Sequence, residues 1–70
     1  MKRQTKALMK LKGLRVQNGY TQKEFAELMG ISHAAYVQRE LGNRDFNSSQ
    51  MLKIGDLLGV DAGELFFAQE

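Results

Sequence analysis

The stretch TQKEFAELMGISHAAYVQRELG, residues 21–42, has the features of two short helices joined by a tight turn. Thr21 is suited to cap the first helix with its hydroxyl group, and Glu24, three residues later, can complete a capping box. Gly30 is expected to adopt the left-handed conformation that ends many helices. These residues predict one helix between Thr21 and Gly30 and a second helix directly after it.

The second helix is expected to begin after Ser32, whose side chain can cap it, and to run to about residue 41 before Gly42. Ala26 is small where a following helix would cross most closely, and Tyr36 is bulky and apolar on the expected inner face. A small residue, a glycine four positions later and a bulky apolar residue six beyond that satisfy the steric needs of a helix-turn-helix.

Apolar spacing predicts which helix faces are buried. Residues 5–17 form the expected first helix, and Gly13 weakens it by roughly 1 kcal/mol relative to alanine, for which close packing is the only evident reason. A further helix is expected to be capped by Asn47 or Ser48, and a last one by Asp61. The residues expected in the core of these helices and of the helix after Thr21 are Leu8, Leu11, Leu14, Phe25, Leu28, Met29, Met51, Leu52, Ile54, Leu57 and Leu58.

Four segments carry a resemblance to a known family: LKGLR (residues 11–15), TQKEFAELMGIS (21–32), Glu40 with Gly42, and MLKIGDLLGVDAGELF (51–66). In these segments the chain resembles the phage repressor and Cro-like helix-turn-helix family of the xenobiotic-response-element type. The resemblance implies an all-α, lambda-repressor-like fold, a compact bundle of about five short helices whose third helix enters the DNA major groove.

The resemblance also implies roles for polar residues. An arginine at the position of Arg15 pairs in the family with the glutamate at Glu40, so a structural salt bridge is expected, with phosphate contact by Arg15 as the alternative. Gln22, at the first position of its helix, is expected to contact a DNA phosphate. Lys23 is adjacent, and either assists or is simply solvated.

In the loop after the third helix, Asn43 and Arg44 are candidates for phosphate contacts, with a solvated loop as the alternative. One position departs from the family pattern: Arg39 stands where an apolar residue is usual, and Leu41 where a polar one is usual. Either Arg39 lays its aliphatic stem across the core and releases its charged head, or the end of the helix is rotated or shortened.

The outward face of the third helix is expected to contact bases. Gln38 suits the edge of adenine, Ala34 and Val37 suit a thymine methyl group, and His33 suits a guanine or a phosphate. Extra core packing is the alternative for Val37. The full set of candidate base-contacting residues is Ser32, His33, Ala34, Val37 and Gln38.

Length and composition limit the function. The 70 residues are expected to form a single domain over residues 1–70, with a basic arm or an early helical turn at residues 1–6. There is no cysteine, and the lone histidine has no companion at metal-ligand spacing, so no metal, cofactor or small-molecule ligand is expected. No nucleophile–base pair indicates an enzyme. No apolar run approaches the ~20 residues of a membrane span, so a cytoplasmic protein is expected.

Charge is distributed unevenly although the net charge is only +2. Residues 1–29 carry seven basic and two acidic side chains, whereas residues 45–70 carry one basic and five acidic side chains. This asymmetry favours one face for a polyanion, although a basic N-terminal region can also be merely solvated.

Together these features predict a bacterial or phage transcriptional regulator, a repressor that binds double-stranded DNA as a homodimer on a palindromic operator. Phe67 is a candidate for the dimer interface, with packing on the first helix as the alternative. The competing hypothesis is a protein-interaction module on the same fold, such as an antitoxin or antirepressor, with weak or no specific DNA binding.

Overall fold

The computed structural model describes residues 5–67, which form five α-helices and, within that range, no strand. The helices are α1 (Thr5–Gln17), α2 (Gln22–Met29), α3 (His33–Glu40), α4 (Ser48–Leu58) and α5 (Ala62–Phe67). The expected all-α bundle of about five short helices is therefore confirmed. The expected arm at residues 1–6 is helical at residues 5 and 6, and its first four residues lie outside the described range.

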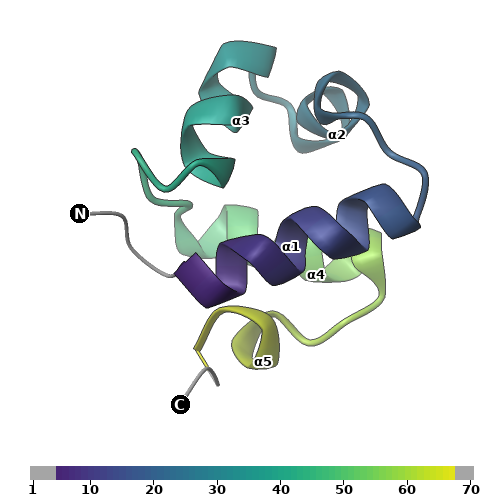
Figure 1. Ribbon diagram of the computed structural model, residues 1–70, viewed down its shortest axis with the longest axis vertical. Coiled ribbons are helices and arrows are strands. Elements are labelled where there is room, and N and C mark those ends of the chain that lie inside the picture. Colours follow the sequence, from purple (N-terminus) through teal and green to yellow (C-terminus); the bar gives the residue numbers. More distant parts are fainter. Residues whose placement is uncertain (1–4, 68–70) are drawn as a thin grey trace.

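Helix α1 crosses the middle of the molecule, with α2 and α3 on one side of it and α5 on the other (Figure 1). Helix α2 packs against α3 and α4, and α1 packs against α3 and α5. This arrangement leaves α3 at the periphery, supported from within by α1 and α2.

Local capping chemistry sets the helix boundaries. The Thr21 hydroxyl accepts a hydrogen bond from the Glu24 backbone N–H (3.0 Å), and the Thr21 N–H donates to the Glu24 carboxylate (2.9 Å). A second capping box is formed by Asn47, not Ser48, with Gln50. Gly30 is left-handed at φ 75°, as predicted. Each of these contacts satisfies a backbone group that the helix end would otherwise leave unpaired.

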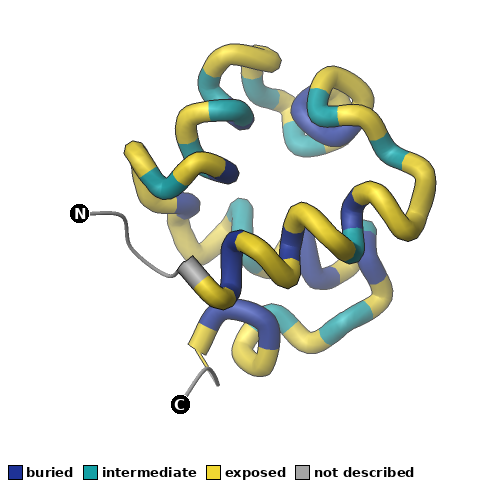
Figure 2. Tube along the Cα trace, in the orientation of Figure 1, coloured by how far each residue is buried: buried dark blue, intermediate teal, exposed yellow. Residues whose placement is uncertain are grey.

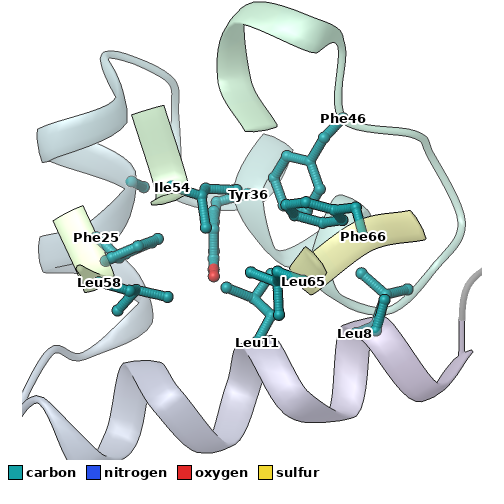
Figure 3. Close-up of a cluster of buried hydrophobic side chains, with 11 residues drawn as sticks. Leu8, Leu11, Phe25, Tyr36, Phe46, Ile54, Leu58, Leu65 and Phe66 are labelled. Atoms are coloured by element: carbon teal, nitrogen blue, oxygen red, sulfur yellow. The ribbon is translucent and has the colours of Figure 1, made fainter. Parts of the chain in front are cut away.

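Five aromatic rings form a continuous row through the core. Ring centroids lie 5.3 Å apart for Tyr20 and Phe25, 5.5 Å for Phe25 and Tyr36, and 5.9 Å both for Tyr36 and Phe46 and for Phe46 and Phe66. Leu8 and Leu11 of α1 pack below this row (Figure 3). The residues with fully or nearly fully buried apolar side chains are Ala7, Leu8, Leu11, Phe25, Ala26, Tyr36, Phe46, Ile54, Leu58, Leu65 and Phe66.

Three expectations about packing are wrong. Leu28 is 44% exposed and Leu52 is 64% exposed, although both were expected in the core. In α2 the buried arc runs through Phe25 and Ala26, and Leu28 falls on the side of the helix away from Ala26. Figure 2 shows exposed residues along the helices of this small bundle. Gly13 makes no close contact: a Cβ atom there would have nothing within 4 Å.

Two helical glycines therefore provide a matched test of packing. Gly13→Ala should raise the free energy of unfolding by about 1 kcal/mol, because alanine favours the helix and the space is open. Gly55→Ala should lower it by roughly 1–3 kcal/mol, because a Cβ atom there would lie 2.8 Å from the Val60 carbonyl oxygen. Thermal or urea unfolding measures both changes, and equal effects of the two substitutions would contradict this description.

Candidate nucleic-acid interface

The carboxylate of Glu40, at the end of α3, accepts hydrogen bonds from three side chains. Arg15 donates from Nε to Oε2 (2.9 Å) and from Nη2 to Oε1 (3.2 Å). The Tyr36 hydroxyl donates to Oε2 (2.6 Å), and Gln22 Nε2 donates to Oε1 (2.9 Å). The ion pair expected between Arg15 and Glu40 is thus present, and we call these four residues the Glu40 network.

Arg15 is held at a second point, where its Nη1 donates to the Tyr20 carbonyl oxygen (2.7 Å). Arg15 is 5% exposed and Glu40 is 8% exposed, so the pair is removed from solvent. With the guanidinium engaged by Glu40 and Tyr20, phosphate contact by Arg15 does not fit this geometry. Figure 3 shows the Tyr36 hydroxyl directed toward α1, on which Arg15 lies.

The network favours the charged form of the pair. Burial by itself would raise the pKa of Glu40, but hydrogen bonds from Arg15, Tyr36 and Gln22 outweigh burial and lower it. Burial would likewise lower the pKa of Arg15, and the Glu40 carboxylate reverses that effect and raises it. Burial and the bond to Glu40 both raise the pKa of Tyr36. The carboxylate therefore stays ionised, and the tyrosine stays a hydrogen-bond donor, at neutral pH.

Gln22 has a role in the structure that was not predicted. It lies at the first position of α2 and is half-buried, with one Nε2 hydrogen donated to Glu40. An amide nitrogen carries two hydrogens, so a second N–H is left for another acceptor. Gln22 can thus connect the buried network to the surface at the start of α2.

The outward face of α3 carries little charge. Ser32, His33, Ala34 and Gln38 are exposed, and Val37 is half-buried. The Ser32 hydroxyl caps the helix by accepting a hydrogen bond from the Ala35 N–H (3.0 Å). Because the acidic side chain of α3, Glu40, points into the core, this face presents no carboxylate.

The end of α3 is not shortened, as one of the alternatives for Arg39 would require. The helix keeps regular geometry to Glu40, with Leu41 as its C-cap residue. Arg39 is half-buried, and its Nη1 donates back along the helix to the Ala35 carbonyl oxygen (3.0 Å). Its head group is therefore held along the helix at one nitrogen. Leu41 is 45% exposed, as its unusual position suggests.

Asn43 and Arg44, in the loop after α3, are both exposed. The Asn43 side chain donates from Nδ2 to Gln38 Oε1 (3.0 Å), and its backbone N–H donates to the Gln38 carbonyl oxygen (3.0 Å). Lys23, on α2, is exposed. The sequence did not indicate the bond between Asn43 and Gln38. The Tyr36–Glu40 bond could have been found from the sequence, because residues four apart lie on one helical face.

This geometry agrees with comparisons with known proteins. The helix-turn-helix family model matches residues 11–65. The chain therefore belongs to the helix-turn-helix family.

The chain is similar to the SPbeta prophage-derived uncharacterized HTH-type transcriptional regulator YonR of Bacillus subtilis (strain 168). The two are 31% identical over 51 residues, which is 73% of this chain and 47% of that protein. The chain thus spans about half the length of this relative.

Residues 5–67 also bear on two other classes of site. None of the helices there has the length and apolar character needed to cross a membrane. In the same range, no group of three or more His, Cys, Asp or Glu side chains is arranged to hold a metal ion.

The Glu40 network makes a prediction about stability. Glu40→Gln should lower the free energy of unfolding at neutral pH by on the order of 3 kcal/mol, because the buried Arg15 charge loses its counter-ion. The exposed Glu27 on α2 supplies the control, since Glu27→Gln should change the free energy of unfolding by less than about 0.5 kcal/mol. Chemical unfolding at pH 7 measures both variants.

The same substitution should change the response to acid. Because the folded-state pKa of Glu40 is depressed, its stabilising contribution is present above its ordinary value of 4.5 and is lost as the pH falls below it. The melting temperature of the wild type should therefore fall more steeply below pH 4.5 than that of Glu40→Gln. Parallel curves would contradict the assigned role of Glu40.

Proposed function

We propose that this chain is a sequence-specific DNA-binding regulator of transcription, and that it acts as a repressor by occupying promoter DNA. The observation that carries this proposal is the outward face of α3, which is free of carboxylates and is fixed in place by the buried Glu40 network. The printed name of its prophage relative, a transcriptional regulator, supports the same class of function.

In this proposal α3 lies in the major groove and its outward residues contact base edges. His33 and Gln38 supply hydrogen-bonding groups, and Ala34 and Val37 supply apolar contacts that suit a thymine methyl group. Ser32, at the start of the helix, completes the set. Each well-read base pair contributes discrimination of about 1–3 kcal/mol.

Phosphate contacts flank α3 on both sides. Gln22 and Lys23 lie at the N-terminus of α2, where backbone N–H groups and the helix dipole favour an anion. Arg44 lies in the loop beyond α3, and Asn43 beside it keeps one Nδ2 hydrogen free for the same strand. These contacts supply affinity that falls as salt rises, without regard to sequence.

We further propose that the protein binds a palindromic operator as a homodimer. Phe67, at the end of α5, is 63% exposed, so the alternative that it packs into the core against α1 does not account for it. An exposed aromatic ring at the end of the last described helix is suited to contact its counterpart across a two-fold axis.

Selection of binding sites from a random duplex pool tests the DNA function. An enriched inverted repeat with half-sites about 10 base pairs apart supports a symmetric dimer that reads bases. His33→Ala with Gln38→Ala should then lower affinity for the enriched site by roughly tenfold or more while leaving affinity for random DNA nearly unchanged. Failure of the folded protein to enrich any sequence would favour a protein-interaction module instead.

The dimer has its own test, for which the chain offers a matched control. Phe67→Ser should weaken self-association, measured by analytical ultracentrifugation, and weaken binding to the inverted repeat more than to an isolated half-site. Leu52→Ser removes an equally exposed apolar side chain from α4. It should change neither self-association nor binding to the inverted repeat. A monomeric wild type that binds single half-sites would remove the dimer from the proposal.

A further inference from the structure

The loop after α3 is attached to Gln38 at two points. The Asn43 backbone N–H donates to the Gln38 carbonyl oxygen, and the Asn43 side chain donates from Nδ2 to Gln38 Oε1, each over 3.0 Å. The first bond places the Asn43 side chain, and the second acts on the group that reads DNA in the proposed function. Gln38 is therefore not free to turn its amide either way.

The direction of this bond decides what Gln38 can offer. A free glutamine presents one acceptor and one donor together, which matches the N6 amino group and N7 of adenine. Here one lone pair of Oε1 is already occupied by Asn43, whereas both Nε2 hydrogens remain available. The exposed part of the Gln38 amide is consequently biased toward donation.

The surroundings of Gln38 have the same character. Gln38 borders a hollow of about 320 Å³ whose other lining residues are Ala34, Ala35, Arg39 and Arg44. The two alanines leave space, and guanidinium groups can only donate hydrogen bonds. Arg39 is held along the helix by its bond to the Ala35 carbonyl oxygen. The hollow thus combines two arginine residues with an amide turned toward donation.

We propose that Asn43 is a positioning residue that fixes Gln38 as a donor, so that this part of α3 reads the acceptor-only edge of guanine. Guanine presents two acceptors, N7 and O6, in the major groove, whereas adenine presents the N7 acceptor beside the N6 amino donor. This inference rests on the proposed function, because it requires α3 to lie in that groove. It replaces the adenine preference that the Gln38 side chain suggests by itself.

Replacement of the amide NH2 group of Asn43 by a carboxylate oxygen provides the test. In Asn43→Asp the carboxylate can only accept, so it should draw Gln38 Nε2 toward itself and turn Oε1 outward. Sites are selected from a random duplex pool with the wild type, Asn43→Asp, Asn43→Ala and Gln38→Ala. The Gln38→Ala variant identifies the base pair read by Gln38, as the position at which preference is lost.

At that position the wild type should select guanine. Asn43→Asp should reduce the preference for guanine about tenfold or more in favour of adenine or cytosine, whose amino groups donate, and leave the other positions unchanged. Asn43→Ala should weaken the preference without reversing it. Lys23→Ala is the control, because loss of a phosphate contact lowers affinity for all sequences and reduces the salt dependence without changing base preference.

The outcomes separate this inference from the function on which it rests. If the wild type enriches a site but selects adenine at the Gln38 position, or if Asn43→Asp leaves the preference for guanine intact, the inference is overturned and the DNA function stands. If Asn43→Asp changes only affinity and its salt dependence, Asn43 is a phosphate contact alone. If the folded wild type enriches no sequence, the proposed function fails, and the inference fails with it.

Discussion

The position of α3 depends on a single carboxylate. Glu40 lies at the last helical position of α3 and receives hydrogen bonds from Arg15 of α1, Gln22 of α2 and Tyr36 of α3 itself. A buried charge is costly unless it is paired and hydrogen-bonded, so the three helices must meet in this one arrangement for the carboxylate to be satisfied. The network therefore ties the position of α3 to those of α1 and α2.

Tyr36 couples this polar network to the apolar core. Its ring lies in the middle of the aromatic row, 5.5 Å from Phe25 and 5.9 Å from Phe46, and its hydroxyl reaches Glu40. A chain of 70 residues without cysteine has a small core and no disulfide to support it. Rigid aromatic contacts and well-formed helix caps compensate for this, because each removes freedom from a short helix that would be unstable alone.

What could be predicted from the sequence was mainly what depends on neighbouring residues. Thr21 with Glu24, Gly30 and Asn47 define helix ends through contacts only a few residues apart, and those boundaries are confirmed. The exposure of Leu28 and Leu52 depends on which helices cover them, and periodicity within one helix does not contain that information.

The candidate site divides in the same way. The pairing of Arg15 with Glu40 followed from the family resemblance, whereas the aromatic link through Phe46 and the bond from Asn43 to Gln38 depend on how the loop after α3 folds back. Short polar side chains in loops have many possible partners, so the sequence alone does not predict which hydrogen bond forms. Of these contacts, the bond from Asn43 to Gln38 is the one on which the proposed preference for guanine depends.

The central claim, that the surface formed by α3 and the start of α2 meets DNA, is tested most directly by backbone amide NMR during titration with a duplex. The largest chemical-shift changes are expected in residues 22–23, 32–38 and 43–44, with the exposed side of α4 around residues 52–56 unaffected. Largest changes on α4 or on the outer side of α1, with α3 unaffected, would contradict it.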